Sequence, residues 1–191
     1  MSKEIVEHQD FKGVDFKKSP LSMAEYENCG FMDCNFSGTD LSDLVFVDCN
    51  FDSCDLSNAK LNGTAFRTVR FQQCKLLGLH FDDCNAFLLS LHFEDCLLNY
   101  AIFYHLKLKN TLFKSCKLEE VDFTEADLSN AVFQECDLKK AVFENTHLQG
   151  ADFRSAFNFS IDPEKNRMKK AKFSAQNIVG LLDRYDIIVV P

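Results

Sequence analysis

The 191-residue sequence contains 29 acidic and 21 basic residues, which gives a net charge of −8. Such a charge repels phosphate backbones, so we expect no direct nucleic-acid partner. It has no apolar span of about 18 residues, and its first residues lack the apolar core of a signal peptide, so we expect a cytoplasmic protein without a membrane partner.

A large apolar residue recurs at every fifth position through most of the chain. The first run extends from Phe11 to Phe81, and the second, after a slip of two residues at 82–87, from Leu88 to Phe153. A helix face repeats every 3.6 residues and a strand face every 2, so a period of five fits neither. A short fixed period is typical of a solenoid, in which each unit buries its apolar side chains against its neighbours.

A small or slim residue lies two positions before nearly every large one. All nine cysteines are in this position, spaced by 5, 10, 12, 15 or 20 residues: Cys29, Cys34, Cys49, Cys54, Cys74, Cys84, Cys96, Cys116 and Cys136. Such spacings distribute the thiols along a column, whereas a zinc site needs ligands that converge on one point. We therefore expect buried, reduced cysteines that pack as small hydrophobic residues, and no metal site.

The outward positions carry two acidic tracts that contain no Lys or Arg. The first acidic tract consists of Glu25, Glu27, Asp33, Asp40, Asp43, Asp48, Asp52 and Asp55. The second consists of Glu119, Glu120, Asp122, Glu125 and Asp127, with Glu135 and Asp137 following. These tracts predict either a surface that keeps the protein soluble or a surface that recognises a basic partner.

Apolar residues gather at outward positions just after the slip. They are Phe87, Leu89, Leu97, Tyr100, Ile102, Tyr104 and Leu112. Scattered exposed apolar residues mean little, but seven within one or two coils favour a contact surface. Because they are distributed over several sides, they do not form one obvious patch.

The repeat breaks near Asn158 and Pro163, and the tail has a different pattern. Ser174 is placed to cap a short amphipathic helix, which ends before a strand-like apolar run at 187–190. The apolar tail residues predict a homodimer contact, with capping of the chain's own rod as the alternative: Ile178, Leu181, Leu182, Tyr185, Ile187 and Val189. We therefore divide the chain into a repeat domain at 1–156 and a C-terminal module at 157–191.

No arrangement of residues indicates catalysis or a cofactor. The sequence lacks a glycine-rich phosphate loop, a G-x-S-x-G motif and an H-E-x-x-H motif. Carboxylates on a convex rod have no cleft to desolvate them, so general acid–base chemistry is not expected. We expect a binding protein rather than an enzyme.

The consensus A-(D/N)-(L/F)-x-x, visible in AKLNG, TDLSD, ADLSN, CDLKK and ADFRS, resembles the pentapeptide-repeat family. The resemblance covers residues 10–156 and implies an all-β solenoid, a right-handed four-sided β-helix with four repeats to a coil. A 20-residue order in the second run agrees with it. Phe93, Phe113, Phe133 and Phe153 form one set, and Leu98, Leu118 and Leu138 another. About seven coils at ~4.8 Å would give a rod roughly 35 Å long.

A repeat rod that ends in I-D-P-x-x-N, a short helix and an apolar tail resembles the bacterial topoisomerase-protection branch of this family. That branch contains the quinolone-resistance Qnr proteins and immunity proteins against gyrase-poisoning peptides. The resemblance implies a DNA-mimicking homodimer that binds a type II topoisomerase, DNA gyrase or topoisomerase IV, and protects it from a poison. The chain lacks the long loops of the quinolone-resistance members, which places it nearer the immunity proteins. The alternative is a scaffold protein with another protein partner.

Overall fold

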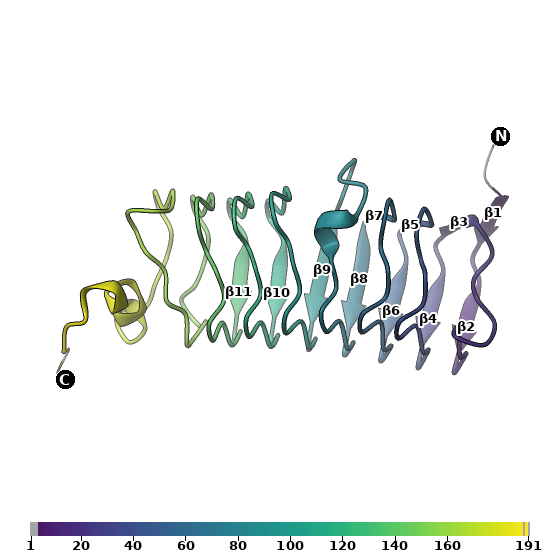
Figure 1. The fold of residues 1–191 in the computed structure, drawn as a ribbon, viewed down its shortest axis with the longest axis horizontal. Helices are drawn as coiled ribbons and strands as arrows, with labels where there is room; N and C mark the ends of the chain where they lie inside the picture. Colours follow the sequence, from purple (N-terminus) through teal and green to yellow (C-terminus); the bar gives the residue numbers. More distant parts are fainter. Residues whose placement is uncertain (1–3, 189, 191) are drawn as a thin grey trace.

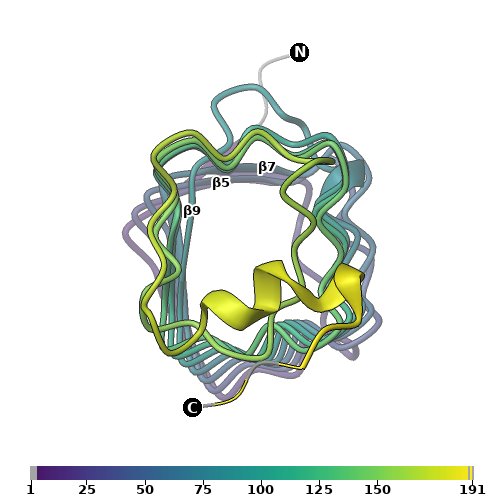
Figure 2. The ribbon, with the colours of Figure 1, turned by 90° about the vertical axis from the view of Figure 1, so that its left-hand side faces the viewer.

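Residues about 20 positions apart lie side by side along the whole chain, so the polypeptide winds into a rod of stacked coils (Figure 1). The structure is a computed structural model that describes residues 4–188 and 190. It is an all-β parallel solenoid of about seven turns, as the period of five predicts. Seen from its end, each coil is four-sided (Figure 2).

Two of the four sides contain regular parallel sheets. Side 1 is a four-stranded sheet made of β1 (Glu4–Glu7), β3 (Ala24–Glu27), β5 (Val45–Val47) and β7 (Ala65–Arg67). Side 2 is a seven-stranded sheet made of β2 (Asp10–Lys12), β4 (Gly30–Met32), β6 (Asn50–Asp52), β8 (Val69–Gln72), β9 (Leu91–Glu94), β10 (Leu112–Lys114) and β11 (Val132–Gln134).

Sides 3 and 4 are held by single β-bridges between successive coils. Asp55 pairs with Lys75 on side 3, and Ile102 pairs with Asp122 on side 4. The chain follows the sides in the order 1, 2, 3, 4. Because every coil repeats this order, the side of any outward residue follows from its place in the repeat.

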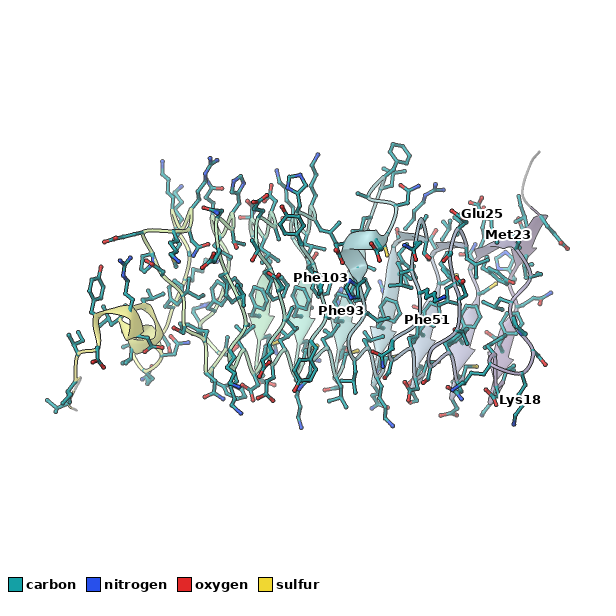
Figure 3. All side chains as sticks on the ribbon, viewed as in Figure 1. Lys18, Met23, Glu25, Phe51, Phe93 and Phe103 are labelled. Atoms are coloured by element: carbon teal, nitrogen blue, oxygen red, sulfur yellow. The ribbon has the colours of Figure 1, made fainter. Side chains whose placement is uncertain are left out.

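The large residue of each repeat points into the rod, where rings stack on rings (Figure 3). On side 2, Phe113 and Phe133 are parallel at a centroid distance of 5.0 Å. Phe103 and Phe123 on side 4 stack at 5.3 Å, so aromatic columns occupy opposite sides in the second run. Full burial of one such side chain contributes about 1.5–3 kcal/mol.

The cysteines are all free and buried, as predicted. Their thiols also form hydrogen bonds that the sequence pattern did not predict. The Cys54 thiol donates to the carbonyl oxygens of Phe31, 3.3 Å away in the previous coil, and of Asp52. Thr64 donates in the same way to the Leu41 carbonyl at 2.8 Å. The slim position therefore accepts a residue that is both small and a weak hydrogen-bond donor.

The slip is a loop that protrudes from the rod between β7 and β9 (Figure 1). It follows the short 3-10 helix η1 (Phe81–Asp83). The expectation that Leu88 is the first inward residue of the second run is wrong, because Leu88 is 63% exposed and has a left-handed backbone, φ 60°. Leu89 packs against the core instead. The register resumes at β9, where Phe93 pairs with Phe71 across a 22-residue interval.

The C-terminal module folds across the end of the rod (Figure 2). The predicted helix is two 3-10 segments, η2 (Ile178–Leu181) and η3 (Asp183–Tyr185). The tighter 3-10 geometry does not keep an i, i+3, i+4, i+7 set on one face. The predicted strand-like run is also wrong for the described residues 187, 188 and 190, which have no strand structure.

We expect Leu118→Asp to unfold the middle coils. Leu118 is fully buried, and its carboxylate replacement would have no partner in the apolar column that also contains Leu98 and Leu138. The thermal midpoint should fall by at least about 8 °C. Gln149→Asp, which adds the same group at an exposed position, is the matched control and should change it by less than about 2 °C. Equal midpoints for the two variants would contradict the assignment.

The thiols of the native protein should not react with thiol reagents. All nine thiols are buried, so a reagent in solution cannot reach them, and burial also raises the pKa of Cys49 to about 12. Because reaction needs an accessible thiolate, Ellman's reagent at about pH 8 should not modify the folded chain. All nine cysteines should react after unfolding in guanidinium. Rapid stoichiometric reaction of the native protein would show that the core is open.

Candidate protein-binding surface

The coil corners place many acidic side chains outward, and they do so through backbone geometry. The second residue after nearly every inward residue has a left-handed conformation, as at Asp33, φ 53°, and Asp48, φ 51°. Glu120, φ 56°, and Glu125, φ 59°, are corner residues of the second acidic tract. Among residues with a Cβ, Asp and Asn adopt this conformation most readily, so part of the acidic composition serves the turns.

A second group of acidic residues stabilises the turn that follows each of them, because the carboxylate accepts a hydrogen bond from the backbone N–H two residues later. The carboxylate of Asp55 accepts a hydrogen bond from the backbone N–H of Ser57 at 2.9 Å, and Asp122 accepts one from Thr124 at 2.8 Å. Asp40 does the same with Ser42, and these hydrogen bonds lower the pKa of Asp40. Asn35 makes the equivalent bond to Ser37, so an amide performs this structural task without charge.

The first acidic tract surrounds the N-terminal coils rather than forming a patch on one side. Glu25 and Glu27 lie on side 1, Asp52 on side 2, Asp55 on side 3 and Asp40 on side 4. The remaining members lie at the corners between sides: Asp33, Asp43 and Asp48. All are exposed or half-buried, as predicted. Figure 3 shows Glu25 at the edge of the rod.

Few cations neutralise the first acidic tract. Arg67 reaches across two coils to Glu25, with Nη1 3.6 Å from Oε1. Glu27, Asp33, Asp48 and Asp55 make no ion pair with any residue in the described part of the chain. These carboxylates therefore remain available to a basic partner.

The second acidic tract is different, because the neighbouring coils supply bases that are distant in sequence. Lys139 and Lys140 lie 2.8 Å from Glu119 and Glu120, respectively. Lys109 lies 3.2 Å from Asp127. The sequence stretch contains no Lys or Arg, but the 20-residue stacking brings cations beside it. A search for charge along the sequence alone misses these ion pairs, although the 20-residue spacing of Glu119 and Lys139 indicates them.

The net negative charge of the protein consequently lies in its N-terminal half. Residues 1–100 contain 16 acidic and 8 basic residues, whereas residues 101–191 contain 13 of each. The cross-coil ion pairs concentrate in the second part, as at Lys165 and Glu144, 2.9 Å apart, and at Lys172 and Asp152, 3.8 Å apart. The molecule is thus a rod with an acidic N-terminal half and a neutralised C-terminal half.

The predicted apolar surface near the slip separates into three places. Phe87 lies in the protruding loop and is 65% exposed, and Leu97 is half-buried on side 3. Tyr100, Ile102 and Tyr104 follow one another onto side 4, and the Tyr104 hydroxyl bonds to Glu125 at 3.3 Å. Of this set, only the last three form a continuous stripe.

The C-terminal module contacts the rod through one part and leaves another part exposed. The side-chain amide of Asn177 donates to the carbonyl oxygens of Phe153 and Ala156, at 2.7 and 2.9 Å. Leu181 and Leu182 are half-buried, and Leu181 packs against the core.

Three further residues of the predicted dimer contact remain outside that packing. Ile178, Tyr185 and Ile187 are 47%, 50% and 55% exposed. Val189 lies outside the described residues. The segment therefore caps its own rod and still presents an apolar surface.

The described part of the chain contains no cluster of three or more His, Cys, Asp or Glu residues arranged to hold a metal ion. Within the same residues, no helix has the length and apolarity needed to cross a bilayer.

Comparison with known proteins supports the architecture. The model of the pentapeptide repeat region matches residues 44–123 and 107–181. No curated protein sequence matches significantly. Two structures of trypsin-treated variants of QnrB1, a plasmid-mediated fluoroquinolone resistance protein, are similar in fold at 18% identity. Their TM-scores are 0.65 and 0.64, with 97% and 96% of this chain and 100% and 99% of the other chain covered. Because the family model matches more than half of the sequence, the chain belongs to the pentapeptide-repeat family.

Proposed function

We propose that this protein binds a type II topoisomerase, DNA gyrase or topoisomerase IV, and protects it from a poison. The observation that carries the proposal is the first acidic tract, whose carboxylates surround the N-terminal coils with few neutralising cations. An enzyme that binds duplex DNA must offer a basic groove, and an acidic rod is the complementary shape and charge. The fold similarity to QnrB1, a fluoroquinolone resistance protein, supports the same class of activity.

The N-terminal half is the part of the rod that we assign to this contact. The second acidic tract offers less charge, because Lys139 and Lys140 already occupy Glu119 and Glu120. Binding through the N-terminal half would leave the C-terminal module free for self-association. A functional assay must therefore compare two classes of poison, a quinolone and a peptide toxin.

Replacing Asp33, Asp48 and Asp55 together with Asn tests the role of charge alone. Asn retains the left-handed corner and the hydrogen bond to a backbone N–H, so the thermal midpoint should stay within about 2 °C. Binding to purified gyrase or topoisomerase IV should weaken about tenfold, because three exposed charge contacts are lost. Protection from a quinolone or peptide poison in a supercoiling assay should fall in parallel. The wild-type affinity should also decrease steeply with salt.

The matched control removes the same amount of charge from later coils through Asp122→Asn, Glu135→Gln and Asp137→Asn. This triple variant should retain most of the binding and protection. If both triple variants lose binding equally, only net charge matters and the N-terminal assignment is wrong. If wild-type protein binds neither topoisomerase at low salt, the chain is instead a scaffold for another partner.

We also propose a homodimer formed through the exposed part of the C-terminal module. Ile178 and Ile187 are about half exposed, whereas Leu181 packs against the core of the rod. Adjacent apolar side chains at the end of a rod favour association with an identical end.

The double variant Ile178→Glu with Ile187→Glu should be monomeric in light scattering at tens of micromolar, while wild type is dimeric. Because both side chains are substantially exposed, the melting profile of the monomer should remain cooperative. Val142→Glu, at an exposed position on side 4, is the control and should stay dimeric. A monomeric wild-type protein at that concentration would refute the dimer without affecting the topoisomerase proposal.

A further inference from the structure

Side 2 carries an open channel that shares one residue, Asp52, with the first acidic tract and none with the apolar tail. It has a volume of about 550 Å³ and extends over five successive coils, from Asp10 to Glu94. Its two walls are the residues just before and just after each inward Phe of β2, β4, β6, β8 and β9. The first wall consists of Asp10, Gly30, Asn50, Arg70 and His92, and the second of Lys12, Met32, Asp52, Gln72 and Glu94.

Gly30 contributes no side chain to the first wall, and the Asp10 carboxylate of the preceding coil covers its backbone. An added Cβ at this position would come within 2.5 Å of the Asp10 carboxylate, which leans over the glycine. Met32, 42% exposed, is the facing residue of the second wall. This part of the channel therefore places an exposed thioether side chain opposite a carboxylate.

Arg70 gives the channel an uncommitted cation. Its guanidinium makes no ion pair with any residue of the described chain, and its strand neighbours in the first wall are Asn50 and His92. Of the other cations, Lys114 pairs with Glu94 at 2.5 Å, and Lys12 lies in the second wall three coils away from Arg70. Burial, and then the charge of Arg70, lower the pKa of His92. An anion that binds Arg70 would therefore meet a neutral imidazole, which can donate a further hydrogen bond.

Asp52 supplies the complementary charge on the opposite wall, one coil away from Arg70. Its carboxylate accepts a hydrogen bond from the Ser53 hydroxyl at 2.8 Å and makes no ion pair with a described residue. The walls are two residues apart along each strand, which is about 6.6 Å, and adjacent coils are about 4.8 Å apart. Successive side chains of an extended peptide alternate sides, so adjacent acidic and basic residues would reach opposite walls.

We propose that this channel binds an extended peptide segment of a partner protein, running along the rod axis. The segment carries an acidic residue that pairs with Arg70, a neighbouring basic residue that pairs with Asp52, and an apolar residue that packs against the exposed Met32. The length favours a peptide over a single amino acid, because four coil spacings measure about 19 Å. The inference does not depend on the topoisomerase proposal, since it concerns the wall chemistry of side 2.

The probes are two synthetic peptides, acetyl-Gly-Glu-Lys-Leu-Gly-amide and the reverse order acetyl-Gly-Leu-Lys-Glu-Gly-amide. We expect one of them to shift backbone amide signals of β4, β6 and β8 saturably in an NMR titration. The bound carboxylate should raise the pKa of His92, measured from its imidazole signals, because it offsets the charge of Arg70. Arg70→Glu should weaken binding at least tenfold, which is about the effect of losing one charge-assisted pair.

Lys75→Glu is the matched control, since it reverses a cation on the neighbouring side 3, outside the channel. It should bind the peptide like wild type, and Arg70→Glu should in turn prefer a peptide in which Lys replaces Glu. The inference is overturned if neither peptide gives saturable shifts at about 10 mM, a range that covers weak peptide contacts. Equal losses in both variants, or equally tight binding of free glutamate, would also overturn it.

Discussion

In-register stacking of successive coils is the constraint on which every other feature of this protein depends. Residues about 20 apart become lateral neighbours, so each position in the repeat generates a column of like environments. Inside, the columns stack Phe113 on Phe133 and Phe103 on Phe123. Outside, the same stacking sets Lys139 against Glu119. The core and the surface charge pattern therefore arise from one geometric rule.

That rule changes how the acidic residues should be interpreted. Asp33 and Asp48 occupy left-handed corners, and Asp55 closes a turn with its carboxylate. Each task is also performed by Asn in this chain, as at Asn28, φ 52°, and Asn35. Backbone geometry therefore explains why these positions contain Asp or Asn, but it does not explain why so many of them contain the charged Asp. The repeated use of Asp in the N-terminal coils is the feature that indicates a function.

The sequence predicted the core more completely than the surface. The period of five identified inward residues such as Leu118 and placed the nine cysteines in a buried, reduced column. The predicted inward register just after the slip was wrong. Leu88 has a left-handed backbone in the protruding loop, and Leu89 packs against the core in its place. The tail was only partly predicted, because a short segment has several ways to cap a rod end, and the 3-10 form emerges from contacts such as those of Asn177.

The surface was harder to predict because partners in a solenoid are separated by whole coils. The second acidic tract contains no base in sequence, yet ion pairs with Lys139 and Lys140 neutralise much of it. The channel on side 2 has the same origin, since Gly30, Arg70 and His92 come from different coils and meet only through stacking. A surface site on such a rod is a property of columns. Such a site can be predicted once each outward residue is assigned to its side and its coil. The repeat of this sequence permits that assignment everywhere except at the slip and in the C-terminal module.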